Sequence, residues 1–595
     1  MDFPENAVLL QALNRNARFG KSLLFRNPDA IVRADAADEV MAALHAAESW
    51  LARGFHIAGY VAYEAGYAFE ERFVAYDARR NAGPLVWFGV YAGPKSAEAF
   101  AAESPESGHD AGGVIHQDFI EYSRAVRRVR SYIAEGDVYQ VNYTYRARLN
   151  ALGNPFSLYA ALRRAQTAEY AAFIRHDDRS ILSLSPEMFF HAAHGEITTR
   201  PMKGTACRGG SSSEDDALAA DLRSCPKNRA ENTMIVDLLR NDLGRICETG
   251  SVSVESMFDI ERYETVHQMT STIKGRLREG VSLAEIFRNL FPSGSVTGAP
   301  KIRAMEIIHE LESTPRGVYT GAIGYASPNG DMLFNVAIRT LVADKSGSAL
   351  GIGSGIVWDS EADDEYRECI LKAGFLEAAR TRSAGFQLIE TLRYDGSFPL
   401  LPLHLDRLAS SAEHFGFVFS HEKIRRELDA FSANPDTSVP RRVRLLLSRD
   451  GSITLQASVL QETPFPVRIG ISARRVDSAD PFLYHKTTRR DLYADELQSA
   501  QDRGLFDVLF RNERGEITEG CITNVFVEKN GKLLTPPVSS GLLGGVYRRH
   551  VLETMPNAYE RILLIEDLRS SDRIFVCNAV RGMMPAILAE QAEES

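Results

Sequence analysis

The chain has 595 residues, of which 44% are hydrophobic and 25% charged, and its formal net charge is -11. This acidic balance argues against nucleic acid as a partner, because phosphate binding needs a basic surface. No apolar run is long enough to span a bilayer, and the first residues lack the basic-then-apolar pattern of a signal peptide. The six cysteines show neither metal-ligand spacing nor a disulfide framework. We therefore expect no membrane partner and a cytoplasmic setting with reduced thiols.

Strand-like and helix-like segments alternate along the whole chain. Residues 331–342 (DMLFNVAIRTLV) are typical of a strand and residues 229–242 (RAENTMIVDLLRND) of a helix. This alternation predicts an α+β or α/β architecture in both halves. Small and polar residues at 101–113 predict a surface loop, and those at 377–385 a domain boundary. We place a first domain at 1–380, a linker at 381–385 and a second domain at 386–595.

Residues 183–205 read as a hairpin that carries an acid and an amine. One strand is SLSPEMFF, the turn lies near His194, and the return strand is EITTRP. Glu187 and Lys203 lie at similar distances from the turn, so they could face each other across the pair. Such a pair could act as acid and nucleophile, and the alternative is an ion pair on the surface.

Two predicted helices place carboxylates on apolar faces. Glu231 shares the apolar stripe of a helix at 228–242, and Glu365 and Glu368 are neighbours on a helix at 363–379. Buried carboxylates are costly unless they are paired or bind a metal. A cation between the helices would satisfy them, and oxygen ligands without histidine or cysteine suit Mg²⁺. The alternative is pairing with nearby arginines, namely Arg229, Arg240 or Arg367.

Two further features predict an anion site. The glycine-rich segment 291–308 runs into a helix with Pro300 near its first turn, where free backbone N–H groups would suit a carboxylate. Arg339 ends a strand-like run and offers a planar fork for a second carboxylate. A glycine-rich loop before a helix is a weak signal by itself, and this one does not match the Walker pattern.

Several motifs in the first 380 residues go beyond generic patterns. They are IAEGDVYQVNYT (133–144), SLSPE (183–187), RPMKGT (200–205), KNRAENTMIVDLLRNDLGR (227–245), TVHQMT (265–270), FPSGSVTGAPKIRAMEII (291–308) and GIGSGIVWDSEADDEYRE (351–368). In this order they resemble the chorismate-utilising enzymes, specifically aminodeoxychorismate synthase component I. The resemblance covers roughly residues 50–380, and it implies an anthranilate-synthase-like α+β domain with two sheets.

The resemblance also implies a set of substrate and metal contacts. Mg²⁺ would be held by Glu231 and Glu368, with Glu365 beside them, and would grip the ring carboxylate of chorismate. The remaining implied substrate contacts are the side chains of Arg339 and Tyr319, which would hold the enolpyruvyl carboxylate, and the segments at Gly204, Thr205 and Gly355. Gln140 stands where isochorismate and salicylate synthases carry a lysine base, which argues against water activation.

The implied chemistry centres on an amine that blocks one ring carbon. Glu187 would protonate the departing 4-hydroxyl, and His267 would sit near that hydroxyl. Lys203 would attack C2 as the hydroxyl leaves, and ammonia would then attack C4 and release the lysine. Anthranilate synthases carry alanine at the position of Lys203 and put nitrogen at C2. A lysine that occupies C2 explains why nitrogen arrives at C4 here.

From residue 386 onward the chain resembles aminodeoxychorismate lyase, in the pyridoxal-phosphate class that includes the D-amino-acid aminotransferases. The matching segments are LPLHLDRLASSAEHFGF (401–417), YHKTTRR (484–490), GEITEGCITNVF (515–526), SGLLGGVYR (540–548) and FVCNAVRGMMPA (575–586). The resemblance implies a D-amino-acid-aminotransferase-like fold with two α/β subdomains. The first strand expected for this class is missing, so the small subdomain is shortened or completed by the N-terminal half.

Four residues would bind pyridoxal 5'-phosphate in this second domain. Lys486 would bind the cofactor covalently and act as the base at C4, Glu519 would pair with the pyridine nitrogen, and Arg407 would clamp the phosphate with help from Thr523. Three of them have a plainer reading: Lys486 as a surface charge, Glu519 as a turn carboxylate and Arg407 as a helix-surface residue. A tyrosine that often follows the lysine appears here only as Tyr493, at an unusual distance.

The leading hypothesis is a bifunctional enzyme that makes p-aminobenzoate from chorismate. No cysteine sits in the Gly-x-Cys-x-Gly turn of a glutamine amidotransferase, so ammonia would come from solution or from a separate glutaminase subunit. In the alternatives, only the first domain is active and the second is a scaffold or an aminotransferase, or the chain merely binds chorismate for regulation.

Overall fold

The computed structural model describes residues 3–12, 22–73, 83–97, 113–149, 153–165, 168–209, 212–263, 266–345, 347–376, 386–433, 439–478 and 480–589. The predicted linker at 381–385 lies outside these ranges, as does all but one residue of the predicted loop at 101–113. The chain forms two compact units, one of residues 1–207 and 219–384 and the other of residues 208–218 and 385–595. Helix α5 (Ser212–Ser224) spans the division.

The first unit contains two 10-stranded sheets in its described part. The first sheet runs, in spatial order, β16 (Gly298–Ala299), β8 (Gln140–Leu149), β20 (Gly347–Ile356), β19 (Thr340–Asp344), β10 (Arg179–Ser185), β9 (Tyr170–His176), β1 (Ala7–Gln11), β2 (Leu23–Phe25) and β6 (Lys95–Ser96), with β7 (Val114–Ile115) beside β8. The second runs β13 (Met202–Cys207), β15 (Val266–Arg276), β12 (Glu196–Arg200), β11 (Met188–Ala193), β18 (Met332–Val336), β17 (Ala322–Ala326), β4 (His56–Val61), β5 (Val86–Tyr91) and β3 (Ala30–Ala34), with β14 (Ser253–Arg262) beside β15.

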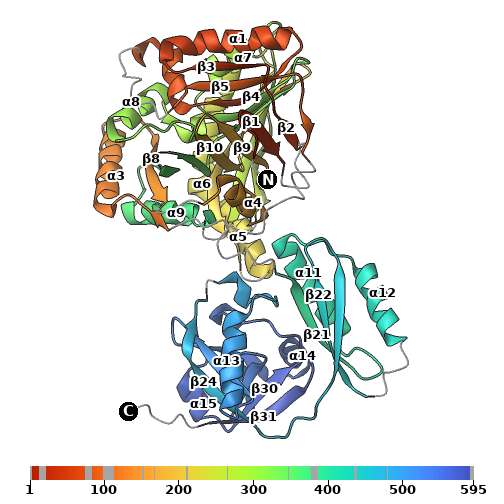
Figure 1. Ribbon diagram of the computed structural model, residues 1–595. Coiled ribbons are helices and arrows are strands. Elements are labelled where there is room, and N and C mark those ends of the chain that lie inside the picture. Colours follow the sequence, from red (N-terminus) through yellow and green to blue (C-terminus); the bar gives the residue numbers. More distant parts are fainter. Residues whose placement is uncertain are drawn as a thin grey trace. The chain divides into compact units, whose positions relative to one another are not determined.

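The two sheets pack face to face, with helices on their outer sides. Alternate residues of β9 enter different cores: Ala172 and Ile174 pack toward the second sheet, whereas Ala171 and Phe173 pack toward the helices. Figure 1 shows α1 (Val40–Ala52) and α7 (Leu283–Leu290) over β3, β4 and β5. The other helices of this unit are α3 (Phe119–Ala134), α4 (Pro155–Ala165), α6 (Pro226–Gly244), α8 (Lys301–Leu311) and α9 (Ala362–Ala373). The expected two-sheet α+β architecture is therefore confirmed.

The second unit has two subdomains, as expected. The small one is a three-stranded sheet of β21 (Leu388–Tyr394), β22 (Arg441–Leu447) and β23 (Ile453–Val459), with α11 (Leu401–Phe415) and α12 (His421–Ser432). The larger is a mixed sheet in the order β26 (Ile517–Gly520), β25 (Asp507–Asn512), β24 (Val467–Val476), β31 (Gly582–Leu588), β30 (Arg573–Asn578), β27 (Asn524–Lys529), β28 (Lys532–Thr535) and β29 (Ala558–Glu560). Its helices are α13 (Asp491–Asp502), α14 (Val546–Thr554) and α15 (Ile565–Arg569).

Within the described part of the chain, no helix combines the length and the apolar character needed to cross a membrane.

Candidate active sites

Most of the site residues predicted in the first domain lie around one cavity of about 390 Å³. The predicted residues that line it are Glu187, Lys203, Gly204, Thr205, Glu231, Tyr319, Arg339, Gly355, Glu365 and Glu368. Both sheets and helices α6 and α9 contribute to this lining. Among the predicted residues, the lining extends from Glu187 to Glu368, which are 181 positions apart in the chain.

The route that brings Glu187 and Lys203 together differs from the predicted hairpin. Met188 pairs with Arg200, so the register would place Pro201 rather than Lys203 opposite Glu187. After Pro201 the chain leaves the pairing with β11, while β13 continues along β15, the strand with which β12 also pairs. Lys203 therefore reaches the cavity from a separate strand, and the expected direct cross-strand pairing is wrong. A surface ion pair is also wrong, because Glu187 is buried at 4% exposure.

Glu187 lies in a setting that favours its protonated form. Burial raises the pKa of Glu187 to about 7, although the hydrogen bond from Ser295 and the charge of Lys203 oppose this rise. The Ser295 hydroxyl donates to Oε1 of Glu187 at 2.6 Å. A carboxyl group that keeps its proton near neutral pH can act as a general acid.

Lys203 lines the cavity close to the backbone of Gly355. A methyl group built on Gly355 would lie 3.2 Å from Lys203 Nζ and 2.2 Å from Gln140 Nε2, so a side chain at this position would displace both groups. Burial lowers the pKa of Lys203, whereas the carboxylates of Glu231, Glu187 and Glu368 favour its charged form. A lowered pKa increases the fraction of neutral amine, which is the nucleophilic form.

The three carboxylates predicted to bind a metal come from α6 and α9. Glu231, Glu365 and Glu368 line the cavity, and burial together with the two other carboxylates raises the pKa of Glu231. Glu365 accepts a hydrogen bond from the Ser360 hydroxyl at 2.6 Å, and Glu368 pairs with Lys372 at 2.6 Å. In the described residues, no group of three or more histidine, cysteine or acidic side chains is arranged to hold a metal. Two carboxylates that share a cavity still suit Mg²⁺, which binds few protein ligands beside water and an anionic substrate.

The arginine alternative for these carboxylates is contradicted. Arg240 pairs with Asp237 and Arg367 pairs with Asp364, while Arg229 lies over the Phe258 ring at 4.2 Å. The partner of each arginine is thus a residue other than Glu231, Glu365 or Glu368.

Arg339 and Tyr319 form another part of the wall. Arg339 has a left-handed backbone, with a φ of 49°, in the short connection between β18 and β19. Burial lowers the pKa of Arg339. The Tyr319 ring packs against the backbone at Gly351, where an added methyl group would lie 2.0 Å from Cγ of the ring. A guanidinium and a phenol that line the same cavity can together bind a carboxylate.

Two predicted residues do not line the cavity. On β15, Val266 and Gln268 line it, and because side chains alternate along a strand, the intervening His267 points to the opposite face. Gln140 is buried at 1% exposure behind Gly355, and its amide nitrogen and oxygen make no hydrogen bond to any described residue. The expected anion site at the start of α8 also differs, because Gly298 and Ala299 pair with β8 as β16 and the helix start is not in the lining.

The structure adds three residues that the sequence patterns did not single out. Ser295, Lys227 and Lys372 line the cavity. Ser295 belongs to the glycine-rich segment that was noted only for its backbone, and Lys372 follows Glu368 by one helical turn. The i to i+4 spacing of Lys372 and Glu368 was a usable signal.

The predicted cofactor residues of the second unit line a cavity of about 270 Å³. Lys486, Glu519, Arg407 and Thr523 all face it. Burial, together with Arg490 and Arg407, lowers the pKa of Lys486 to about 7. The backbone carbonyl of Lys486 accepts from the N–H of Ile389 at 2.8 Å. The reading of Lys486 as a surface charge is wrong.

Glu519 is buried and hydrogen-bonded rather than a turn carboxylate. Tyr493 donates to it at 3.1 Å and the Asn524 amide at 3.4 Å, so Tyr493 reaches the site despite its unusual spacing. Burial raises the pKa of Glu519 to about 7, and the charge of Arg490 opposes this rise. A carboxyl group in this position can share a proton with a pyridine nitrogen.

At the phosphate end of the predicted cofactor site, Arg407 and Thr523 are hydrogen-bonded to carboxylates of the protein. Arg407 donates through Nε and Nη2 to Glu390, at 2.8 and 2.6 Å, and is only 15% exposed, so it is not a helix-surface residue. The Thr523 hydroxyl donates to Asp507 at 2.7 Å. Gly545 and Val546 line the cavity at the start of α14, where free backbone N–H groups favour an anion. Cationic side chains, this helix start and an amine together fit pyridoxal phosphate.

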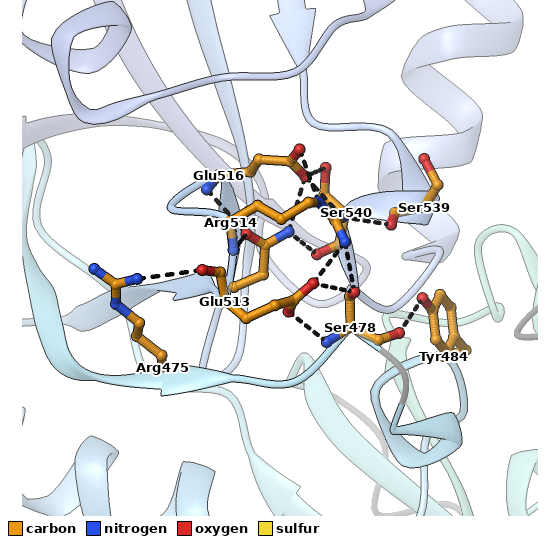
Figure 2. Close-up of polar contacts among 9 residues, drawn as sticks. Arg475, Ser478, Tyr484, Glu513, Arg514, Glu516, Ser539 and Ser540 are labelled. Carbon is orange, nitrogen blue, oxygen red and sulfur yellow. Dashed lines mark hydrogen bonds and ion pairs between the residues drawn. The ribbon is translucent and has the colours of Figure 1, made fainter. Parts of the chain in front are cut away.

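A polar network fastens the loop that precedes Lys486. Figure 2 shows the backbone N–H and hydroxyl of Ser478 bonded to Glu513, at 2.9 and 2.7 Å, and the Tyr484 hydroxyl donating to the Ser478 carbonyl at 2.7 Å. Arg514 joins Ser478 to Glu516. Because Glu513 and Glu516 lie in the hairpin that leads to Glu519, the network links the segments of Lys486 and Glu519.

Comparison with known proteins gives two family matches. Residues 6–378 match the family described as chorismate binding enzyme, and residues 387–588 match amino-transferase class IV. The chain is 40% identical over 286 residues to aminodeoxychorismate synthase component 1 of Bacillus subtilis, which is 48% of this chain and 58% of that protein. It is 42% identical over 259 residues to anthranilate synthase component 1 of Aquifex aeolicus, which is 44% of this chain and 52% of that protein. The chain thus spans little more than half of these relatives' length.

A solved structure supports the fold of the first unit. The anthranilate synthase component I of Streptococcus pneumoniae TIGR4 aligns with a TM-score of 0.50 and 29% identity, over 63% of this chain and 93% of that one. The expected anthranilate-synthase-like fold is confirmed for the first half, and the class IV aminotransferase assignment is confirmed for the second.

Proposed function

We propose, from the premise that the chain belongs to the chorismate binding enzyme family, that it makes p-aminobenzoate from chorismate in two steps. The first unit would aminate chorismate at C4, and the second would eliminate pyruvate from the aminated product. The observation that carries the proposal is the shared cavity of Glu187, Lys203, Glu231 and Glu368.

The aminating step follows from an acid and an amine in one enclosed space. As the C4 hydroxyl leaves, Glu187 gives it a proton and the Lys203 amine forms a bond to C2. Ammonia then bonds to C4, the two ring double bonds shift back, and the bond between Lys203 and C2 breaks. The lysine regains its electron pair, so water is the net leaving group. Nitrogen is directed to C4 because Lys203 occupies C2.

Magnesium is the metal that the family and the donor set imply for this step. Glu231 and Glu368 would hold it, and Glu365 stands beside them. When bound, the ion neutralises the negative charge of the substrate's ring carboxylate. Arg339 and Tyr319 would orient the enolpyruvyl carboxylate from the other wall.

The second step uses the amine and carboxyl groups of the second cavity. Pyridoxal phosphate supplies an electron sink when bound. Lys486 removes the proton from C4 of the aminated ring, Glu519 holds a proton at the pyridine nitrogen, and Arg407 and Thr523 lie at the phosphate end. Loss of pyruvate leaves an aromatic ring, which drives the reaction.

Ammonia would reach the first cavity from a separate glutamine amidotransferase subunit or from solution. The relatives named component 1 support the idea of a second component. We place the enzyme in the cytoplasm, where its thiols would remain reduced.

The test is incubation of the purified chain with chorismate, Mg²⁺, ammonium and pyridoxal phosphate, without any keto acid. We expect p-aminobenzoate and pyruvate in equal amounts. Lys203→Ala should abolish the product or divert it to anthranilate, whereas Lys274→Ala, at a lysine of β15 that pairs with Glu255 and does not line the cavity, should behave as the unaltered chain. Anthranilate from the unaltered chain, or unchanged product from Lys203→Ala, would refute the proposed first step.

A further inference from the structure

Behind the first cavity lies a buried arginine that the proposed chemistry does not use. Arg316 is only 2% exposed and follows α8 in the chain. Its guanidinium lies 4.4 Å from the ring centre of Tyr63 and pairs with Glu312, with distances of 2.9 Å from Nε and 2.6 Å from Nη2. A buried ion pair of this kind is weak evidence for stability, because desolvation offsets much of its attraction. Its other contacts give it a more specific role.

The remaining N–H groups of Arg316 reach three segments of the cavity wall. Nη1 donates to the Val296 carbonyl at 2.7 Å and, more weakly, to the Thr320 hydroxyl at 3.5 Å. Nη2 donates to the Asn142 carbonyl at 2.6 Å, across 174 positions of sequence. Val296 and Asn142 line the cavity, and Thr320 follows Tyr319, which also lines it. The Arg316 guanidinium is therefore hydrogen-bonded to three segments of the cavity wall, at Asn142, Val296 and Thr320.

The segment held through Val296 is the one that controls the proposed acid. Val296 directly follows Ser295, whose hydroxyl donates to Glu187 at 2.6 Å. Ser293 supports the same hydroxyl at 2.9 Å. This hydrogen bond lowers the pKa of Glu187 against the effect of burial, and Lys203 is the charged group that acts on Glu187 in the same direction. A shift of Ser295 would therefore change how firmly Glu187 holds its proton.

Arg316 is itself fixed on its backbone side. Its N–H and that of Gly317 donate to the two oxygens of Glu64, at 2.6 and 2.9 Å. Its carbonyl accepts from Arg146, which also donates to the Pro315 carbonyl. The guanidinium thus extends from an anchored backbone. Only an arginine offers five donors in a rigid planar fork, whereas a lysine offers a single flexible ammonium.

From this geometry we infer that Arg316 is a positioning residue for the proposed amination, which acts by holding Val296, and hence the Ser295 hydroxyl, against Glu187. Arg316 itself does not line the cavity. The inference rests on the proposed function, and it assigns to the Arg316 fork a role in catalysis distinct from its pairing with Glu312.

The test compares Arg316→Lys, Ser295→Ala and the double variant, with Arg288→Lys on the exposed face of α7 as the control. Arg316→Lys keeps a cation beside Glu312 but loses the bonds to Val296 and Asn142. We expect kcat to fall about tenfold, KM for chorismate to change little, and the alkaline limb of the pH profile to move upward, as in Ser295→Ala. The double variant should be little worse than the worse single variant, because both changes break one linkage.

Three results would overturn the inference. The first is an alkaline limb of the pH profile that does not move in Arg316→Lys. The second is a double variant in which the losses of kcat from the two single changes add fully. The third is a variant in which only KM for chorismate changes. If Arg316→Lys does not fold, Arg316→Met combined with Glu312→Leu removes the buried pair together and leaves an apolar core, and the same shift of the limb is expected. Failure of both to fold would assign Arg316 to folding alone. Absence of amination by the unaltered chain would instead refute the proposed function.

Discussion

Lys372 Nζ lies 2.6 Å from Oε1 of Glu368, one turn along α9, and also donates to the Gly353 carbonyl at 2.9 Å. Burial raises the pKa of Glu368, but the charge of Lys372 and its hydrogen bond outweigh burial, so the net shift is downward. Glu368 therefore stays ionised in the cavity, and the ammonium occupies one side of the carboxylate that a metal would use.

Lys372→Met should lower the Mg²⁺ concentration needed for half-maximal binding. Removing the ammonium removes a competitor for Glu368, and an ion pair that is about two-fifths exposed contributes at most about 1 kcal/mol, or roughly fivefold in affinity. Calorimetric titration of Mg²⁺ measures the change, and Lys345→Met, at an exposed lysine, is the control. A higher Mg²⁺ requirement in Lys372→Met would show that the ammonium helps to build the metal site instead.

The amination rate should fall as pH rises through about 7, the pKa to which burial raises Glu187. The rate should fall because the Glu187 carboxyl group is protonated below its pKa, where it can act as an acid, and is ionised above it. Initial rates should be measured with saturating chorismate and referred to the concentration of neutral ammonia at each pH. A rate that stays flat across this range would remove Glu187 from the acid role.

Gly355→Ala should reduce amination by about tenfold or more while the protein still folds. The added methyl group would lie 2.2 Å from Gln140 Nε2 and 3.2 Å from Lys203 Nζ, so both side chains must shift, and a misplaced nucleophile costs rate steeply. Gly244→Ala is the matched control, because its methyl group meets no other atom within 4 Å. Product analysis and thermal melting separate a local effect from general destabilisation, and equal activity of the two variants contradicts the predicted position of Lys203.

Lys486→Ala should abolish covalent retention of pyridoxal phosphate, because it removes the amine that lies in the second cavity. Borohydride treatment followed by mass measurement should label the unaltered chain but not this variant, and Lys532→Ala, on the exposed side of β28, should still be labelled. In the unaltered chain, capture of the cofactor should speed up as pH rises through about 7, because the pKa of Lys486 is lowered to about 7 and the neutral amine reacts. If the reduced cofactor were found on a different lysine, Lys486 would not be the residue that binds it.

The spacing of residues on one face of a helix or a strand explains which parts of the site could be predicted from the sequence. Glu231 could be assigned to an apolar helical face, and Glu365 and Glu368 to one side of another helix, because three- and four-residue spacings are local and need no knowledge of the fold. The same rule could have revealed Lys372. On β15 the alternation predicts that Val266 and Gln268 share a face, but not that this face, rather than that of His267, lines the cavity.

Alternating segments predicted an α+β or α/β architecture, and local spacing predicted the carboxylates on helical faces. The resemblance of the motifs to known families predicted the two-sheet first unit, the two subdomains of the second and the residues that carry the proposed chemistry. The partners of those residues were decided by long-range packing alone. Ser295 meets Glu187 across 108 positions, and β13 continues along β15 without pairing with β11. Arg407 is turned toward Glu390, 17 positions away. Hydrogen bonds and burial act over a few ångströms in space, whatever the separation along the chain, so only the folded arrangement could determine these contacts and the pKa shifts that follow from them.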